Sequence, residues 1–498
     1  MMVERRRNEM TFIDFLPFLS TSIFLLNVIF AVLVVFFERR KPASSWAWLL
    51  VLFFIPFFGF IIYMVFGRNS KREKMFIQKE KYDTEVYYRY LLFNDTSLDA
   101  FRSQKKIIEE KNGEPVVQNN LDDLISLHIN AGSWVTTNNT LKHFIDGNHK
   151  FDTLVEDIRQ AKKFIHMEYY ILRGDDLGKK IVHELALKAK EGVEVRLLYD
   201  GMGCAALPRN FFQELEQCGG YAVAFLPRFI IRLNYRDHRK LCIIDGEIGY
   251  IGGFNIGNEY LGIVKRYGAW RDTHLRIQGD AVDQLQIRFM MDWNFITAYA
   301  PISLKKVYFP DREQIDGIKM QIISSGPDTV WKNIWNGYFK MMNEAAKHIY
   351  IETPYFVPDD GILEALRVAA LSGIDVRIII PGNPDHFFVY WASMSYLGEL
   401  LEAGVRCYQY EKGFIHTKAV FIDGKICSIG TANMDIRSFD LNFEINAFIY
   451  DKETTTLLEQ DFLNDLDNCV EITKEWYSKR KWWFRVKESV SRLISPML

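Results

Sequence analysis

Two long apolar runs open the chain. Residues 15–37 carry no charged side chain over 23 positions, and residues 42–67 carry none over 26. With a rise of about 1.5 Å per residue, a helix of either length crosses a hydrocarbon layer of about 30 Å. The pattern predicts two transmembrane helices joined by the charged loop 38–41. A cleaved signal peptide is the alternative for the first run. A re-entrant hairpin is the alternative for the second, which Pro56 and Gly59 interrupt.

Beyond residue 130, the hydrophobic positions alternate between two periods. Helical spacing is found in 154–161, 179–192, 333–347 and 362–373, and strand-like patterns in 163–172, 193–200, 348–356 and 374–380. Strands that alternate with helices predict an α/β fold. The second series repeats the order of the first, and IHMEYYILRGDD (165–176) is similar to IYIETPYFVPDD (349–360). The chain is therefore predicted to be a tandem duplication of one α/β domain, with a pseudo-twofold axis between the copies.

These patterns divide the chain into four parts. Residues 1–70 are expected to form a two-span membrane anchor, and residues 71–130 a juxtamembrane linker. The two related domains follow at 131–310 and 311–498, and the second ends in an amphipathic segment. In that segment, EWYSKRKWWFRVKESVSRL (475–493), aromatic and basic residues are interleaved. The segment suits either a membrane interface or a last helix that packs on the core with its charges solvated.

Charge and cysteine content narrow the function classes. The formal net charge is −2 over 498 residues, which argues against a broad basic footprint for nucleic acid. The six cysteines are scattered without a CxxC pair, as expected of free thiols in a reducing compartment. Nine basic residues lie in the tail before the first apolar run and close after the second run, against three in the loop 38–41. This asymmetry predicts a cytoplasmic body.

One sparse motif occurs twice in the chain. HRKLCIID (238–245) and HTKAVFID (416–423) share a histidine, a lysine two positions later and an aspartate five positions beyond the lysine. On a strand, His238 and Lys240 point to one face while Asp245 has the opposite parity. The second copy repeats this arrangement with His416, Lys418 and Asp423.

The residues after each motif predict a hairpin. Asp-Gly between two apolar runs is a strong turn signal, and it occurs at 245–246 and 423–424. Each return strand then passes small residues and reaches an asparagine, Asn255 in the first copy and Asn433 in the second. Each half is therefore expected to present His, Lys and Asn from a hairpin with room at its end.

Two histidines and two lysines that face each other suit phosphodiester chemistry. The lysines and asparagine amides can hold the phosphate oxygens. One neutral imidazole can attack phosphorus to form a phosphohistidine, and the other, protonated, can donate to the leaving alcohol. The two imidazoles are expected to hold opposite protonation states, set by their neighbours. Because lysine seldom ligates metals and no Cys/His/carboxylate cluster accompanies the motif, neither a metal nor another cofactor is expected.

The doubled pattern resembles the motif of the phospholipase D superfamily, and the whole chain resembles bacterial cardiolipin synthases. Stretches 38–60, 270–277, 431–448 and 492–498 carry the wider resemblance. It implies two phospholipase D-like domains in a multi-pass protein of the bacterial cell membrane. The implied reaction joins two phosphatidylglycerols into cardiolipin and releases glycerol. The implied partners are phosphatidylglycerol, other anionic lipids and the membrane, without nucleic acid, and a homodimer stays open.

The resemblance also implies roles for individual residues. His238 is expected to be the nucleophile and His416 the general acid, with Lys240 and Lys418 on the phosphate. In that superfamily the motif aspartate, here Asp245 and Asp423, is largely architectural, which agrees with its parity. A later acid often orients each histidine. Glu444, eleven residues beyond Asn433, fits this role, and Asp272, seventeen beyond Asn255, is its weaker counterpart.

Other functions stay open. A membrane-bound phospholipase D would pass the phosphatidyl group to water, and a phosphatidylserine-type synthase would pass it to a different acceptor. A membrane-anchored nuclease can use the same motif, and salt-sensitive DNA binding would favour it. A non-enzymatic membrane scaffold has no use for two intact motifs. Arg271 is a candidate either for binding a head-group phosphate or for a structural ion pair.

Overall fold

The computed structural model describes residues 21–22, 24–32, 42–55, 58–59, 63, 74–110, 120–226, 235–297 and 299–495. The chain forms two compact units. The first contains Met1–Glu73 and Phe229–Asn234, and the second contains Lys74–Arg228 and Tyr235–Leu498.

The first unit contains helix α2 (Pro42–Phe54). Leu52 and Tyr63 are buried there, and the Tyr63 ring lies 5.5 Å from the rings of both Phe30 and Trp48. Among the described residues, no helix has both the length and the apolar character needed to cross a membrane. The two predicted spans, 15–37 and 42–67, lie partly outside the described residues.

The second unit begins with three helices in the segment expected to be a linker. They are α4 (Lys74–Phe93), α5 (Asp95–Glu110) and α6 (Asn120–Asn130). Phe76, Lys79 and Tyr90 of α4 are fully buried, and the Tyr90 hydroxyl donates to Asp283 Oδ2 at 2.8 Å. Because these side chains enter the core, α4 is an integral part of the body.

The first half of the body is one mixed sheet. Its strand order is β1 (Asn139–Phe144), β9 (His274–Gly279), β7 (Ile248–Gly252), β6 (Lys240–Ile244), β2 (Phe164–Tyr169), β3 (Glu194–Asp200) and β4 (Tyr221–Phe225). Strands β2, β3 and β4 are parallel, and the other pairs are antiparallel. Its helices are α7 (Gly147–Gln160), α8 (Asp176–Lys190), α9 (Gln213–Gln217) and α10 (Ala281–Ile296), with 3-10 turns at Asn258–Leu261 and Lys306–Tyr308.

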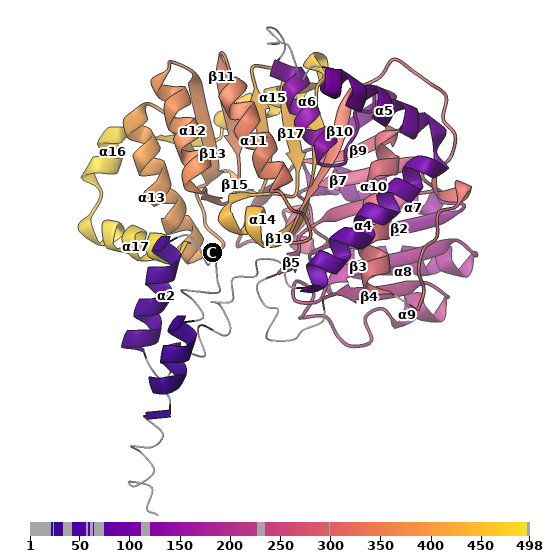
Figure 1. The fold of residues 1–498 in the computed structure, drawn as a ribbon, viewed down its shortest axis with the longest axis horizontal. Helices are drawn as coiled ribbons and strands as arrows, with labels where there is room; N and C mark the ends of the chain where they lie inside the picture. Colours follow the sequence, from indigo (N-terminus) through magenta and orange to yellow (C-terminus); the bar gives the residue numbers. More distant parts are fainter. Residues whose placement is uncertain are drawn as a thin grey trace, which may run out of the picture. The chain divides into compact units, whose positions relative to one another are not determined.

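The second half repeats this order. Its sheet runs β10 (Met320–Ser325), β19 (Asn442–Ile449), β17 (Ile426–Gly430), β16 (Ala419–Ile422), β11 (His348–Glu352), β13 (Asp375–Pro381), β14 (Arg406–Tyr410) and β20 (Cys469–Ile472). The helices are α11 (Asn333–Glu344), α12 (Asp360–Leu371), α13 (Phe387–Ala403), α14 (Ile436–Asp440), α15 (Lys452–Leu466), α16 (Lys474–Lys479) and α17 (Trp482–Leu493). The matching strand orders confirm the predicted α/β duplication (Figure 1).

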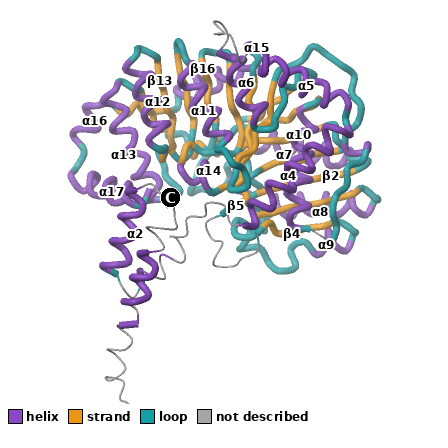
Figure 2. Tube along the Cα trace, in the orientation of Figure 1, coloured by secondary structure: helices purple, strands orange, loops and turns teal. Residues whose placement is uncertain are grey.

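Short strands join the two halves. β5 (Arg236–Asp237) pairs with β19, and β8 (Ala269–Arg271) pairs with β15 (Gly413–Ile415), so each half adds a strand to the other. Within the second half, β12 (Phe356–Val357) pairs with β18 (Met434–Asp435). One hydrophobic core also contains residues of both halves, including Leu241, Ile251 and Ile445. The two sheets therefore lie side by side in a single body (Figure 2), and β5 and β15, the short strands that end just before His238 and His416, each pair with a strand of the other half.

Both predicted hairpins are present. Asp245 and Gly246 have φ of +56° and +73°, and Asp423 and Gly424 have +56° and +64°. Two successive positive φ angles are typical of the tight turn for which Asp-Gly is suited. The Asp245 carboxylate accepts the main-chain N–H groups of Lys162, Lys163 and Phe164 at 2.7–2.9 Å, and Asp423 accepts those of residues 346–348 at 2.8–2.9 Å. The motif aspartates thus tie each hairpin turn to the start of the neighbouring strand.

We expect Asp245→Ala to destabilise the first half without removing its chemistry. The variant loses three hydrogen bonds to a carboxylate, which together contribute about 2–3 kcal/mol to the free energy of unfolding. Thermal unfolding followed by circular dichroism measures the loss, and turnover per folded molecule is expected to stay within about threefold of wild type. Asp245 lies at the turn of the hairpin, at the opposite end of β6 from His238. A loss of turnover in a fully folded variant would therefore contradict an architectural role.

Candidate active site

His238 precedes β6 and is oriented by a carboxylate of the other half. Its Nδ1 lies 2.9 Å from both carboxylate oxygens of Glu444 on β19. Glu444 is fully buried, and its Oε2 also accepts the Thr431 hydroxyl at 2.6 Å. The Tyr170 ring contacts the imidazole edge to face, with 4.8 Å between centroids. Because Nδ1–H donates to the carboxylate, Nε2 is left as the reactive nitrogen.

His416 precedes β16 and has the reciprocal arrangement. Its Nδ1 lies 2.7 Å from Asp272 Oδ2, and Asp272 belongs to the first half and is fully buried. The His416 main-chain N–H donates to the Arg271 carbonyl at 2.7 Å, and the His238 N–H donates to the Phe443 carbonyl at 3.0 Å. Both histidines are therefore positioned, through side chain and main chain, by the half to which they do not belong.

Asp272 and Glu444 occupy equivalent places. On β7 and β9, Gly252 is opposite His274, and on β17 and β19, Gly430 is opposite Asn446. Asp272 and Glu444 each lie two residues before these partners. The different spacing from Asn255 and Asn433, which made Asp272 the weaker candidate, therefore reflects a longer connection and not a different position.

Small residues make room for these carboxylates. A Cβ added to Gly253 would lie 2.0 Å from Asp272 Oδ1. The equivalent residue in the second half is Thr431, whose hydroxyl donates to Glu444 instead. The small residues noted in the sequence after each return strand thus lie beside the acid that orients the opposite histidine.

The two lysines lie beside the histidines. Lys240 Nζ donates to the His238 carbonyl at 2.6 Å and lies 5.3 Å from the centre of the Tyr170 ring. Lys418 Nζ is 2.9 Å from His416 Nδ1 and also donates to the His416 carbonyl. Burial lowers the pKa of Lys240 to about 7 and that of Lys418 to about 8, although Glu444 and Asp272 oppose the shift. A bound anion would stabilise the charged form of both lysines.

Burial also sets the charge of the imidazoles. It lowers the pKa of His238 to about 4 against the opposing effect of Glu444, and the pKa of His416 to about 4 with a further contribution from Lys418. Both rings are therefore neutral at neutral pH in the free site. The expectation of opposite protonation states is wrong for the free site, because burial acts equally on the two rings. A bound phosphodiester adds the negative charge that favours a proton on one of them.

The motif asparagines differ between the halves. Asn255 is engaged within its own half, since its Oδ1 accepts the Ile171 N–H at 3.1 Å and its Nδ2 donates to the Tyr260 hydroxyl at 3.1 Å. Asn433 is buried, and its Oδ1 has no hydrogen-bond partner among the described residues. The two amides, both expected to hold phosphate oxygens, thus have unequal surroundings.

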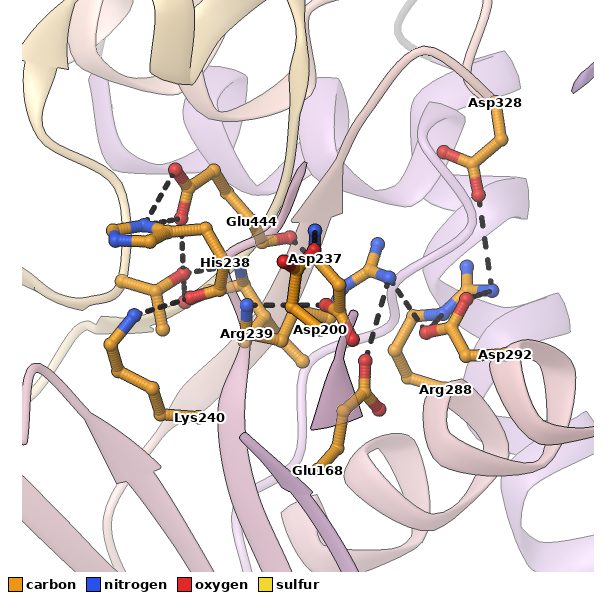
Figure 3. A network of polar contacts seen from close by, with 12 residues as sticks. Glu168, Asp200, Asp237, His238, Arg239, Lys240, Arg288, Asp292, Asp328 and Glu444 are labelled. Atoms are coloured by element: carbon orange, nitrogen blue, oxygen red, sulfur yellow. Dashed lines mark hydrogen bonds and ion pairs between the residues drawn. The ribbon is translucent and has the colours of Figure 1, made fainter. Parts of the chain in front are cut away.

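A buried charge network lies behind His238 (Figure 3). Arg239 Nη1 is 2.6 Å from Asp292 Oδ2 on α10, and Arg239 Nε donates to the Glu444 carbonyl oxygen at 3.4 Å. Asp292 also lies 2.9 Å from Arg288 and 2.9 Å from Lys79 Nζ. Because Lys79 is on α4, this network connects the first helix of the body to the residue that orients His238.

A buried guanidinium also lies beside the residue that follows His416, but it comes from the first half of the chain. The residue after His416 is Thr417, where the first half has Arg239, and Arg271 of β8 donates to its hydroxyl at 3.2 Å. Arg271 is held by Asp465 of α15 at 2.6 Å. Where the first half has Arg271, the second has Phe443, whose ring lies 5.3 Å from the Arg239 guanidinium. Arg271 therefore makes a structural ion pair, the second of its two predicted roles.

Within the part of the chain that the structure describes, no three His, Cys, Asp or Glu side chains gather in a way that could hold a metal ion. What the site does contain is two neutral imidazoles, each with a carboxylate on Nδ1, and two lysines. This arrangement can bind an anion and can supply both a nucleophile and a proton carrier.

Comparisons with known proteins identify the family. The family described as "Cardiolipin synthase, PLD-like domain" matches residues 154–293 and 338–466, and "Phospholipase_D-nuclease N-terminal" matches residues 25–68. A cardiolipin synthase of Listeria innocua is 47% identical and covers 97% of this chain and 99% of its own. The major cardiolipin synthase of Bacillus subtilis is 47% identical, with 96% and 99% covered.

A solved structure supports the fold. The phosphatidylserine synthase of Haemophilus influenzae matches 72% of this chain and 95% of its own with a TM-score of 0.57, at 15% sequence identity. At that identity the likeness concerns the fold alone. Together, the doubled motif, the duplicated sheets and the near full-length relatives show that the chain belongs to the cardiolipin synthase family of the phospholipase D superfamily.

Proposed function

We propose that this protein is a cardiolipin synthase, which transfers a phosphatidyl group from one phosphatidylglycerol to another and releases glycerol. The observation that carries the proposal is the reciprocal pairing of His238 with Glu444 and His416 with Asp272. Each Nε2 is thereby left for chemistry between the two halves, beside two lysines suited to a phosphate. The 47% identity to cardiolipin synthases over 490 residues supports the choice of substrate and acceptor.

The first step forms a covalent intermediate. Nε2 of His238 attacks phosphorus of the first phosphatidylglycerol, a P–N bond forms, and the P–O bond to the glycerol head group breaks. His416, which receives a proton when the anionic phosphodiester enters, gives that proton to the departing glycerol oxygen. Lys240 and Lys418 offset the charge that develops on the phosphate oxygens.

The second step reverses these roles. A head-group hydroxyl of a second phosphatidylglycerol attacks phosphorus, its proton passes to His416, and the P–N bond to His238 breaks. The product is cardiolipin, and both histidines return to their initial state. The first step exchanges a P–O bond for a P–N bond, and the second exchanges the P–N bond for a new P–O bond. Because each step can run backwards and neither oxidises nor reduces any group, the reaction is reversible and needs no cofactor. Water in the same position would yield phosphatidic acid, so the loaded site must exclude water.

We also propose the membrane arrangement and the domain limits. Residues 1–70 would form a two-span anchor in the bacterial cell membrane. The body, which starts with α4 and contains the two halves 131–310 and 311–498, would lie on the cytoplasmic side. The match of residues 25–68 to an N-terminal segment found in phospholipase D-like proteins supports an anchor in this region. An anchored body suits the substrates, because both phosphatidylglycerols lie in one leaflet.

Product analysis tests the function. The purified protein is placed in phosphatidylglycerol liposomes without added metal, and the lipids are identified by mass spectrometry. Cardiolipin with an equal amount of released glycerol is the expected result. Phosphatidic acid alone would mean that water accepts the phosphatidyl group, and the protein would be a phospholipase D.

The rate is expected to depend on pH through the free site. We expect kcat/KM to fall as the pH rises from about 4 to about 9, since one imidazole, Lys240 and Lys418 must carry protons and burial lowers the pKa of each in the free site. Below about pH 4 the nucleophilic imidazole becomes protonated and the rate falls again. By contrast, kcat should stay level to higher pH, because the bound phosphodiester favours the protonated groups. A kcat/KM that rises between pH 7 and pH 9 would contradict this assignment.

A further inference from the structure

The C-terminal helix α17 exposes its apolar side chains and buries polar ones. Trp482, Val486, Val490 and Leu493 recur every three or four residues, and they are 69%, 48%, 50% and 82% exposed. Two polar residues of the same helix, Glu488 and Ser491, are buried instead. A helix on the surface of a protein in water has the opposite arrangement, with its apolar stripe toward the core.

Polar contacts fix this orientation. Glu488 accepts from Arg480 at 2.6–2.8 Å, and Ser495 Oγ lies 2.9 Å from the Tyr396 hydroxyl on α13. Arg492 pairs with Glu399, also on α13. Figure 1 shows α17 lying beside α13 at the edge of the second half, as their mutual contacts require. The outward stripe is therefore built by the tertiary structure and is not a loosely attached end of the chain.

The surroundings of the stripe are basic. Between positions 479 and 492 the chain has six lysines and arginines and one acidic residue, Glu488. Lys487 Nζ lies above the rings of Phe387, Trp391 and Phe484 at 4.9–5.6 Å. Apolar and aromatic side chains flanked by basic ones are what the interface of an anionic bilayer binds.

The start of α13 connects the stripe with the surroundings of Lys418. Phe387 and Phe388 at the start of α13 are exposed. Two residues before Phe387, the Asp385 carboxylate accepts the Tyr355 hydroxyl at 2.5 Å, and it is one of the charges that act on Lys418. The start of α13 thus meets α17 where Lys487 lies above the Phe387 ring, and it is close enough to Lys418 for the Asp385 charge to act on that lysine.

We propose that the α17 stripe together with Phe387 and Phe388, here called the docking face, inserts into the interfacial layer of an anionic membrane. In this position the docking face holds the active-site mouth against the leaflet, so that a head group enters while its acyl chains stay in lipid. The inference rests on the proposed function in one respect, since it takes the substrate to be an anionic phospholipid. The docking itself is separate from the chemistry and can be measured without turnover.

Hydrogen exchange tests the docking directly. The full chain is placed in nanodiscs of phosphatidylglycerol with phosphatidylcholine, or of phosphatidylcholine alone, and exchange is followed by mass spectrometry. We expect peptides covering 482–493 and the start of α13 to exchange at least about tenfold more slowly in the anionic discs. The double variant Trp482→Ser, Val486→Ser should lose this protection. Leu371→Ser is the matched control, because Leu371 is also 69% exposed but lies elsewhere on the body. It ends α12, just before β13 starts, and the start of β13 lies at the opposite end of the strands from His416.

A kinetic measurement connects docking to catalysis. The double variant is expected to lower cardiolipin synthesis from long-chain phosphatidylglycerol in vesicles about tenfold, and to act like wild type on dispersed short-chain phosphatidylglycerol. Equal protection in both kinds of disc would overturn the proposal. Protection that depends on protein concentration instead of lipid charge would also overturn it, and would indicate a contact between two copies of the protein. Lipid-dependent protection without cardiolipin formation would instead refute the proposed function and leave the docking face intact.

Discussion

His238→Ala is expected to lower cardiolipin synthesis by at least about 10⁴-fold, since the variant has no atom in place to form the P–N bond. His416→Ala is expected to lower it by about 10²- to 10⁴-fold, the range for loss of a general acid. Both variants should fold, because the two imidazoles line the site and each makes its side-chain hydrogen bond to one acid. Steady-state assays in phosphatidylglycerol vesicles measure the loss, and circular dichroism checks the fold. Substantial synthesis by either variant would refute the two-histidine scheme.

A substrate with a good leaving group separates the two roles. The phosphatidyl ester of nitrophenol needs no proton on its leaving oxygen, so His416→Ala should release a burst of about one nitrophenol per enzyme at near wild-type rate. His238→Ala should give no burst. His149→Ala is the control, because His149 is exposed on α7 and its imidazole pairs with Asp146 and with neither motif. A burst from His238→Ala and none from His416→Ala would exchange the two assignments.

The second large effect is expected from the carboxylates. Glu444→Gln and Asp272→Asn keep the size of each side chain but remove the charge that fixes the Nδ1–H tautomer of the opposite histidine. Each variant is expected to lower kcat by about 10²- to 10⁴-fold with little change in KM. Glu459→Gln is a matched control, because Glu459 also pairs with a histidine, His348 Nε2 at 3.0 Å, but at the turn end of the hairpin. That variant should keep its activity.

Each carboxylate orients the histidine of the other half, and this reciprocal pairing makes the prediction specific. Glu444 belongs to the second half but serves His238, so Glu444→Gln should abolish the nitrophenol burst as His238→Ala does. Asp272→Asn should retain the burst, like His416→Ala. If each acid instead served the histidine of its own half, the two results would be reversed, and the reciprocal arrangement of the site would be refuted.

Much of the site could be predicted because its signals are local. The Asp-Gly turns, the alternation along each strand and the spacing of His238 and Lys240 all depend on neighbours in sequence. The same holds for the strand and helix order, from which the duplication follows. These features needed no knowledge of how the halves meet.

The features that were missed depend on contacts between distant segments. Whether an acid serves its own half or the other is decided by the packing of the halves, to which β5 and β8 contribute. The aligned motifs already show Thr417 in the place of Arg239, but the match of Arg271 with Phe443 follows only when the two halves are compared by strand register. The polar composition of residues 71–130 predicts a linker, but Lys79 of α4 is buried, and Asp83, Asp292 and Asp328 compensate its charge.

The central claim is that His238 carries the phosphatidyl group. The most direct measurement loads His416→Ala with the nitrophenyl phosphatidyl ester, denatures the protein at alkaline pH, where a P–N bond survives, and maps the adduct by peptide mass spectrometry. The account predicts one phosphatidyl group on His238. An adduct on another residue, or rapid nitrophenol release with no protein adduct at all, would contradict it.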